Sequence, residues 1–462
     1  MLDQCRYFIF RSTYSISNES FPRPPEYKSS TELLSISKGK HFYAFINYED
    51  AYVQPLILAA LEACLPGSSY TKISSMAELP NPTAHFLQIG PYESLPFEHI
   101  MSHSTTSLVN AYIIRKALIR KHYLSTTAYH WATKNPSSII ATNVKPSCDF
   151  ELDYAEFLDD ALVEAWELQS SFQKNEGKQP HEREWWILKP GMSDRGQGIR
   201  LFSTEEELQS IFEEWEADRP ESDDDGEEAS ALNHDVDAER RSKEGGKDYI
   251  VTSHLRHFIA QPYIHPPLLL AHNSRKFHIR TYVLASGSLE VYVYKPMLAL
   301  FASTPYTPPW STASLPNTPD LSPHLTNTCL QTGSHDGLVN AFWELPLPPS
   351  QKAEIFKQIC ETTGEIFEAA ANGMMVHFQT LPNAFEVFGL DFLVDDKGVP
   401  WLLEVNAFPD FRQTGEELKA LVGGLWEGVM EMAVGRFFGI EVKRAESEEK
   451  MVLVRKLDLG RR

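Results

Sequence analysis

Two acidic side chains and one amide stand where they could share a metal ion. Asp391 and Glu404 lie in two apolar, strand-like runs that flank the turn sequence Asp395-Asp-Lys-Gly398. An even-length loop centred in this turn pairs Asp391 with Glu404 and puts Asn406 on the same face of the hairpin. Two opposed carboxylates at about 5 Å repel unless a cation lies between them. Oxygen ligands suit Mg²⁺, so we predict a magnesium site at Asp391, Glu404 and Asn406; a solvent-facing polar stripe is the alternative.

A lysine followed by glycines could hold phosphates. Lys189 ends an apolar run and is followed by a loop that contains Gly191, Gly196 and Gly198. Glycine lets backbone N–H groups approach phosphate oxygens, and the lysine can neutralise them. The spacing is neither that of a P-loop nor that of a dinucleotide fingerprint. The alternative is an ordinary glycine turn.

Three basic-capable side chains alternate along one predicted strand. Lys276, His278 and Arg280 therefore share a face, while Phe277 and Ile279 point the other way. Such a row would repel itself unless it met an anion, and polyphosphate is the obvious candidate. A solvated strand face remains the alternative.

Two further segments could contact a nucleotide. The apolar run that contains Gln261, Tyr263 and Ile264 ends in a turn and could offer backbone edges and an apolar shelf to adenine. Thr326 and Asn327 follow a proline-rich stretch and could reach a nucleotide or merely cap a turn.

In chain order, these pieces resemble the tubulin-tyrosine-ligase family, which has the ATP-grasp fold. The matching pieces are Lys-Pro-Gly, Gln-x-Tyr-Ile, Lys-Phe-x-Ile-Arg, His-Leu-Thr-Asn, Phe-Gly-x-Asp and Leu-Leu-Glu-Val-Asn, spread over residues 105–410. The segment Leu108-Val-Asn110 and the following Lys116 resemble the family's N-terminal substrate-side motif.

The resemblance implies a role for each matched residue. ATP would be held by Lys189, Gln261, Tyr263, Ile264, Lys276, His278, Thr326, Asn327 and Lys116. Arg280, Lys276 and Asn327 would act in catalysis by positioning the γ-phosphate and the acyl group. Asp391, Glu404 and Asn406 would bind Mg²⁺.

Two positions depart from the family pattern. The family usually has an aspartate where this chain has His278, and an arginine where it has Leu300. Because that arginine helps to hold the acceptor in the family, these two departures concern the acceptor side rather than the nucleotide side.

The elements that must position these residues predict a mixed α/β architecture in three parts, and the resemblance implies that it is the ATP-grasp fold. We expect a flexible tail over 1–40 and an N-terminal α/β domain over 41–150. A central domain over 151–265 would contain a disordered acidic insert over 216–247, and a C-terminal nucleotide- and metal-binding domain over 266–440 would precede a charged tail over 441–462. Helical spacing predicts helices at 52–65, 107–123, 153–172, 205–215, 350–372 and 416–438. Strands are expected at 41–48, 85–89, 184–188, 258–264, 276–285 and 289–294.

Composition limits the class of protein. The net charge of −21 disfavours general nucleic-acid binding, although Glu205–Glu228 alone holds thirteen acidic residues against one arginine. Five scattered cysteines fit reduced thiols, and no apolar run approaches the roughly 18 residues of a membrane span. We therefore expect a cytoplasmic protein, a monomer, with no nucleic-acid or membrane partner.

The expected activity is that of an ATP- and Mg²⁺-dependent ligase that joins a carboxylate to an amine. Its partners would be an amino-acid co-substrate and tubulin or another protein with an accessible tail, for which Arg115, Lys116, Arg120 and Lys121 offer a basic face. The alternative is a nucleotide-binding scaffold that keeps the fold without ligase activity.

Overall fold

The computed structural model describes residues 41–191, 198–217, 256–312, 320–326, 338–442 and 449–459. The tail predicted over 1–40 and nearly all of the insert predicted over 216–247 lie outside these residues. Glu216 and Ala217 are the exception, because they end helix α8 (Glu205–Ala217). The prediction of disorder is wrong for these two residues.

The N-terminal part is a four-stranded parallel sheet in the order β2-β1-β3-β4. The predicted strands at 41–48 and 85–89 and the predicted helix at 52–65 are confirmed as β1, β3 and α1. The elements are β1 (Phe42–Ile46), α1 (Gln54–Cys64), β2 (Tyr70–Ile73), β3 (Phe86–Ile89), α2 (Phe97–Ser102) and β4 (Ser107–Val109).

The single helix predicted over 107–123 is wrong. Its first three residues form β4, which is fully buried and pairs with β3. Helices α3 (Lys116–Ile119) and α4 (Lys121–Lys134) begin later and are followed by α5 (Ile140–Asn143). A short apolar run buried in a parallel sheet cannot be told from a helix segment by periodicity alone.

The central part is a four-stranded antiparallel sheet in the order β5-β8-β6-β7. Its strands are β5 (Cys148–Glu151), β6 (Trp186–Pro190), β7 (Arg200–Phe202) and β8 (His257–Pro262). The continuous helix predicted over 153–172 is wrong: the segment is a 3-10 turn (Ala155–Phe157), α6 (Leu158–Ala161) and α7 (Trp166–Asn175). These helices and α8 share a hydrophobic core with the sheet.

The third part is a seven-stranded sheet built around the long strand β9 (Phe277–Ser286). One edge of β9 pairs with β13 (Phe385–Val394), which in turn pairs with β14 (Pro400–Ala407). The other edge pairs with β10 (Glu290–Tyr294) and β11 (Leu298–Phe301). Strand β12 (Val339–Ala341) joins β11, and a short helix, α11 (Pro309–Thr312), lies in the predicted proline-rich loop.

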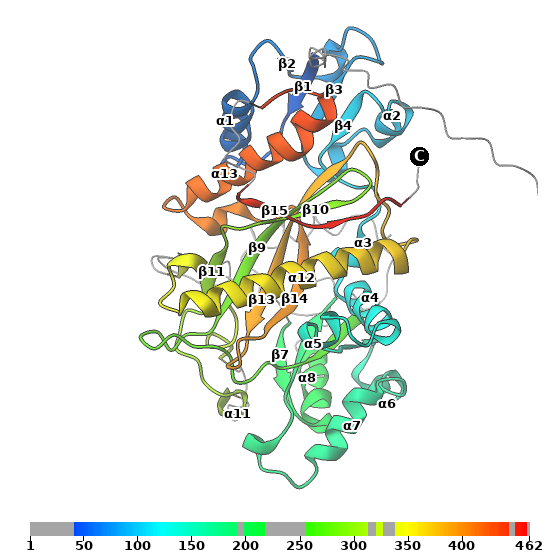
Figure 1. Cartoon of the computed structure of the whole chain (residues 1–462). Helices are drawn as coiled ribbons and strands as arrows, with labels where there is room; N and C mark the ends of the chain where they lie inside the picture. The colour runs from blue at the N-terminus through cyan, green and yellow to red at the C-terminus, as the bar shows by residue number, and fades with distance from the viewer. Residues whose placement is uncertain are drawn as a thin grey trace, which may run out of the picture. The chain divides into compact units, whose positions relative to one another are not determined.

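Helices cover both faces of this sheet (Figure 1). The long helix α12 (Pro349–Gly373) packs on one face, where Ile359 and Phe367 meet Phe388 and Leu390. The other face is covered by α13 (Lys419–Val429), a π-helical segment (Met430–Gly435) and α14 (Arg436–Phe438), which also contact α1. The stretches of β9 and β13 around Tyr282 and Val387 are therefore packed from both sides.

The charged tail predicted over 441–462 is wrong for Met451–Lys456. These residues form β15, which pairs with β10 and also packs against α12. Four apolar residues, Met451–Val454, precede Arg455 and Lys456 in this strand, and Met451 is buried against the core. The three-part division of the chain remains a proposal; the central sheet begins at Cys148, just before the boundary we predicted.

Candidate active site

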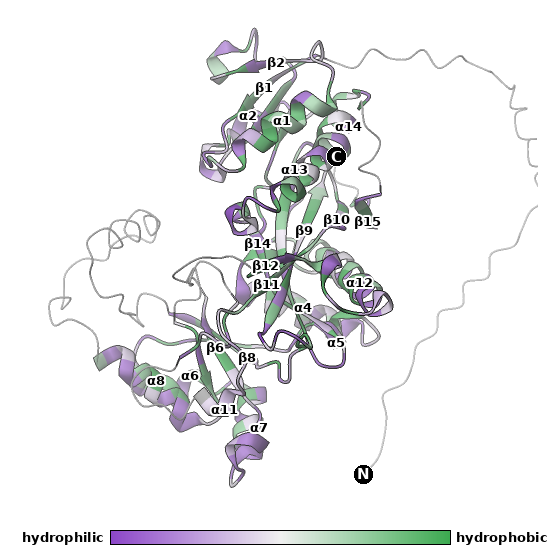
Figure 2. Ribbon diagram, turned by 90° about the vertical axis from the view of Figure 1, so that its left-hand side faces the viewer, coloured by the Kyte–Doolittle hydropathy of each residue, from purple (hydrophilic) through white to green (hydrophobic). Residues whose placement is uncertain are grey.

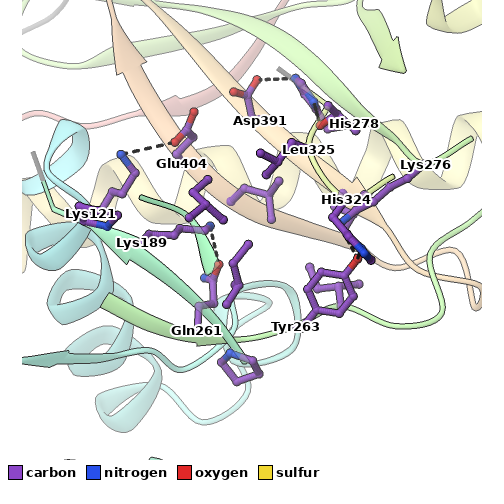
Figure 3. Close-up of a pocket in the computed structure, with 18 of the residues that line it drawn as sticks. Lys121, Lys189, Gln261, Tyr263, Lys276, His278, His324, Leu325, Asp391 and Glu404 are labelled. Carbon is purple, nitrogen blue, oxygen red and sulfur yellow. Dashed lines mark hydrogen bonds and ion pairs between the residues drawn. The ribbon is translucent and has the colours of Figure 1, made fainter. Parts of the chain in front are cut away.

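A cleft with a cavity volume of about 150 Å³ lies where the central sheet meets the large sheet and opens to solvent (Figure 3). One wall comes from β6 and β8 and the other from β9, β13 and β14. The lining residues are Lys121, Ile187, Lys189, Pro190, Ile199, Gln261, Pro262, Tyr263, Ile264, Lys276, His278, His324, Leu325, Thr326, Asp391, Leu393, Leu403, Glu404 and Asn406.

The predicted carboxylate pair is present. Asp391 on β13 is directly opposite Glu404 on β14, and Gly389 is opposite Asn406. The Asn406 amide donates to Asp391 Oδ2 at 3.3 Å and to Glu404 Oε1 at 3.2 Å, so all three side chains converge.

The loop that produces this pairing differs from the one we predicted. Near the turn, Val394 pairs with Pro400, which centres an odd-length loop on Lys397. A β-bulge then inserts Leu403 as an extra residue opposite the junction of Asp391 and Phe392, and this restores the predicted pairing. Bulges re-aim side chains, and here both Leu403 and Glu404 line the cleft.

Each carboxylate already has a cationic neighbour. Arg280 holds Asp391 with two hydrogen bonds, from Nε to Oδ1 at 2.5 Å and from Nη2 to Oδ2 at 3.0 Å. Lys121 Nζ lies 3.8 Å from Glu404 Oε2. Burial raises the pKa of Glu404, but the charges of Lys121 and Lys189 and the Asn406 hydrogen bond outweigh it and lower the pKa to about 2. Glu404 is therefore ionised at neutral pH.

Two lysines enter the cleft from opposite walls. Lys189 donates to Gln261 Oε1 at 2.9 Å, and Lys276 donates to the Tyr263 hydroxyl at 3.2 Å. Burial lowers the pKa of Lys189 to about 8. Burial, followed by the charge of Lys189, lowers the pKa of Lys276 to about 7. The nearby Glu404 offsets the burial of Lys189 only in part, and burial of Lys276 is not offset by an anion, so a polyphosphate would favour the charged form of both lysines.

The histidines of the site are held neutral. His278 Nδ1 lies 2.5 Å from Thr326 Oγ1, and its Nε2 lies 3.5 Å from Asp391 Oδ1. Burial lowers the pKa of His278, against the opposing effect of Asp391. His324 Nδ1 lies 2.8 Å from the Tyr263 hydroxyl, and burial lowers its pKa to about 3.

Apolar side chains line the rest of the cleft. Ile187 and Ile199 come from the central sheet, Ile264 from the segment after β8, and Leu393 and Leu403 from the hairpin. A flat apolar slot of this kind suits a purine base, whose ring needs dispersion contacts on both faces. Sequence reasoning missed Leu393, although its position two residues after Asp391 places it on the same face.

Three predicted site residues do not line the cleft or cannot be placed. Arg280 is buried beneath the cleft, where it forms an ion pair with Asp391. Lys116 is exposed on α3 and does not line the cleft. Asn327 lies outside the described residues. Conversely, Lys121 was predicted only as part of a basic surface, and no sequence signal links it to Glu404.

The basic face predicted from Arg115, Lys116, Arg120 and Lys121 is partly wrong. Arg115 is buried and lies 2.9 Å from the buried Glu386, so it cannot contact an acceptor. The helical spacing that put it beside Lys116 fails because Arg115 precedes α3.

The two departures from the family pattern occupy one cross-strand pair. Leu300 on β11 is directly opposite His278 on β9. Leu300 is fully buried and packs in the core shared with α13. The two positions are adjacent across the strands, and this chain has a neutral pair there.

Comparison with known proteins decides the family. The model of the tubulin-tyrosine ligase family matches residues 143–438. The chain belongs to the tubulin-tyrosine ligase family. A probable tubulin–tyrosine ligase of Schizosaccharomyces pombe is 42% identical over 92% of this chain and 98% of the relative.

Two other members of the family extend the comparison. The probable tubulin–tyrosine ligase PBY1 of Saccharomyces cerevisiae is 40% identical over 94% of this chain, which spans 57% of the relative's length. The crystal structure of the C-terminal domain of K. lactis Pby1, described as an ATP-grasp enzyme interacting with the mRNA decapping enzyme Dcp2, is 36% identical. It covers 91% of this chain with a TM-score of 0.65, and this chain covers 99% of it. The predicted ATP-grasp fold is thus confirmed, and the fold implies ATP binding.

The hairpin residues fit a hard divalent cation. Asp391, Glu404 and Asn406 present only oxygen and amide groups, and the Asn406 amide points at both carboxylates. A flip of the Asn406 side-chain amide exchanges its oxygen and nitrogen. After this flip, the amide oxygen lies beside the carboxylate oxygens. Such a set, with waters and phosphates completing it, is typical of Mg²⁺.

Proposed function

We propose that this family member is an ATP- and Mg²⁺-dependent ligase that adds an amino acid to the tail of a protein through an acyl phosphate. The observation that supports this most is the meeting of two buried lysines, whose pKa values are lowered, with two opposed carboxylates in one cleft. The lysines suit the phosphates and the carboxylates suit the metal. Together they are what phosphoryl transfer requires of a protein, namely positioning and charge stabilisation.

The reaction balances in two steps. A carboxylate oxygen of one substrate attacks the γ-phosphorus of ATP, which gives an acyl phosphate and ADP. The amine nitrogen of the other substrate then attacks the acyl carbon and releases inorganic phosphate, while its proton passes to solvent. Bound Mg²⁺, held by Asp391, Glu404 and Asn406, would neutralise phosphate charge.

Different residues of the chain would serve different parts of this reaction. Lys189 and Lys276 would hold the phosphates, and Ile187, Leu393 and Leu403 would enclose the base. Arg280 orients Asp391 through two hydrogen bonds, so we propose that it acts through Asp391 rather than by direct contact with the γ-phosphate. The roles of Thr326, which holds His278, and of Asn327 and Lys116 stay predictions.

We propose tubulin as the first acceptor to test, because the relatives are named as probable tubulin–tyrosine ligases. Lys116 and Arg120 beside the cleft could attract an acidic tail, and we expect the protein to act as a cytoplasmic monomer. Within the described residues, no helix is long and apolar enough to cross a membrane.

The test is ADP release in the presence of MgATP, each candidate amino acid and a detyrosinated tubulin-tail peptide. Turnover should require both co-substrates and should be lost in Glu404→Gln. Glu361→Gln, an exposed carboxylate on α12, is the control and should retain turnover. ADP release that ignores the acceptor, or an active Glu404→Gln protein, contradicts the proposal.

A second candidate function is a nucleotide-binding interaction protein. The neutral His278–Leu300 pair favours it, since the acceptor side then lacks an arginine clamp. The K. lactis relative is described as interacting with Dcp2. This candidate predicts MgATP binding without turnover for any amino acid or acceptor peptide.

A further inference from the structure

A group of apolar side chains is exposed on the segment that follows β5 and leads into α7. Tyr154, Phe157, Val163 and Trp166 are 45, 49, 56 and 70% exposed, respectively. They are four of the nine large apolar side chains that are exposed within the described ranges. The rings of Tyr154 and Phe157 meet edge to face at 6.2 Å. We call these four residues the Trp166 face.

The Trp166 face is built on a fixed scaffold. The residues between its members, among them Leu158, Leu162 and Ala165, are buried in the core of the central sheet. Glu216 at the end of α8 accepts a hydrogen bond from the Ala155 amide at 2.5 Å. Because the backbone is anchored on both sides, the exposed rings are held outward and lose little freedom when they are covered.

Acidic residues surround these rings. Residues 151–167 contain seven aspartates and glutamates and no lysine or arginine, although Arg256 pairs with Asp153 at 2.9 Å and His257 lies 3.4 Å from Glu151. Glu156, Asp159, Asp160 and Glu164 are exposed. Burial, followed by the charge of Asp159, raises the pKa of Glu205 at the start of α8, which shows that two acidic side chains meet here. The face therefore carries like charges that a cationic partner would relieve.

We propose that the Trp166 face docks a basic segment of a partner protein, with arginines over the aromatic rings and apolar side chains between them. Guanidinium groups stack on aromatic faces and pair with carboxylates, so both features of the face favour the same partner. Rigid exposed aromatic residues are also the usual anchors of protein interfaces. The acidic rim disfavours nucleic acid, anionic membranes and an acidic tubulin tail.

This surface is distinct from the ATP cleft. None of its four apolar residues lines the cleft, and α6, α7 and α8 group together in Figure 2. A partner bound there leaves the cleft accessible, so docking and nucleotide binding are separable in an experiment.

The test uses two synthetic amphipathic peptides, one that combines arginine with leucine and one in which glutamate replaces each arginine. Binding to the whole chain is measured by fluorescence anisotropy at low and high salt. Phe157→Ser/Trp166→Ser and Asp159→Lys/Asp160→Lys/Glu164→Lys should each weaken binding of the basic peptide roughly tenfold or more. Met375→Ser/Val376→Ser, another exposed apolar pair, is the matched control and should bind like the wild type.

Folding of every variant is verified by thermal stabilisation with MgATP. Binding of the basic peptide that weakens with salt and with both sets of substitutions, but not in the control, supports the proposal. Equal binding of the two peptides, or of wild type and Phe157→Ser/Trp166→Ser, overturns it. A wild-type dimer in light scattering that Trp166→Ser dissociates overturns it as well, because the occupant is then a second copy of the chain.

Discussion

At the residue scale, the charges around Asp391 and Glu404 change the expected effect of this carboxylate pair on stability. Both carboxylates have cationic neighbours, Arg280 and Lys121, so repulsion between them is already relieved. Repulsion between like charges, taken alone, predicts that removal of one carboxylate charge stabilises the metal-free protein. The lowered pKa of Glu404 shows the opposite, because an acid with a depressed pKa is stabilised in its charged form.

Glu404→Gln should therefore lower the melting temperature of the metal-free protein at pH 7. The contribution of the ionised Glu404 is present above its unfolded pKa of about 4.5 and is lost as the pH falls toward about 2. The difference in melting temperature between wild type and variant should shrink between pH 5 and pH 3, as calorimetry can measure. A variant of unchanged or higher stability at pH 7 would restore the simpler view of a repelling pair.

ATP binding should be accompanied by proton uptake. The pKa of Lys276 is lowered to about 7 by burial, so at pH 8 this amine is mostly neutral in the free protein. Phosphates favour its charged form, so binding takes up protons and the affinity for MgATP falls as the pH rises above 7. Titration calorimetry at pH 8 in two buffers of different ionisation enthalpy measures the uptake. Lys276→Met should reduce it and Lys357→Met, an exposed control on α12, should not; buffer-independent heats contradict the prediction.

The His278–Leu300 pair can be tested as a unit. Leu300→Arg alone buries a guanidinium beside a neutral histidine and should cost several kcal/mol, on the order of 3–5. His278→Asp/Leu300→Arg supplies a partner for that charge and should recover part of the loss. A double-mutant cycle in urea gives the coupling energy. Tyrosine incorporation into detyrosinated tubulin is then compared for the wild type and the folded double variant. Efficient incorporation by the wild type, with no gain from the double variant, shows that the acceptor side needs no clamp at this place.

At the element scale, glycines decide which elements can approach one another. Gly364 lies in the middle of α12, where a Cβ would come within 2.9 Å of the Val454 carbonyl oxygen of β15. Arg455 Nε donates to the Gly364 carbonyl at 3.3 Å, and Arg455 also pairs with Glu368 at 3.1 Å. Strand β15 thus packs against α12 at Gly364, a position where only glycine fits.

Gly364→Ala should destabilise the protein by about 1–3 kcal/mol, because the methyl group must displace β15. This outweighs the gain of roughly 1 kcal/mol that alanine brings to a helix interior. Gly373→Ala at the end of the same helix has no atom within 4 Å and is the control, with unchanged or slightly higher stability expected. Equal unfolding midpoints for the two variants in urea would show that β15 does not depend on this contact.

At the scale of the whole molecule, a buried contact between Arg115 and Glu386 joins the N-terminal part to the large sheet, and burial raises the pKa of Glu386 to about 8 against the charge of Arg115. Arg115 lies 2.9 Å from Glu386 on β13, and its guanidinium stacks on the Tyr92 ring at 3.8 Å. The Tyr112 amide donates to the same carboxylate at 3.1 Å. Residues far apart in sequence are thereby fixed together behind the hairpin that carries the site.

Glu386→Leu should cost about 3–5 kcal/mol, since it leaves Arg115 buried without its partner. Arg115→Leu/Glu386→Leu removes both charges and should cost less than the single change. Glu62→Leu breaks the exposed pair with Lys72 and should leave the free energy of unfolding nearly unchanged. Denaturation in urea measures all three; a double variant less stable than Glu386→Leu contradicts this account.

The sequence alone was sufficient for the local patterns of the site. Alternation placed Lys276 and His278 on one strand face, and turn residues with apolar flanks gave the hairpin of Asp391 and Glu404. These predictions hold because a strand's side-chain period of two depends only on the backbone. The pairing was predicted from a loop of the wrong length, and it is found in the structure only because Leu403 forms a bulge.

Only the tertiary structure decided which charges meet. Arg280 turns to Asp391 instead of facing the cleft, Lys121 reaches Glu404 from α4, and Arg115 is buried against Glu386. None of these partners has a fixed sequence spacing, because they come from separate strands, helices and connecting segments. Ion pairing and burial depend on distance in space, and that distance is set by how the three sheets pack rather than by any periodicity of the chain.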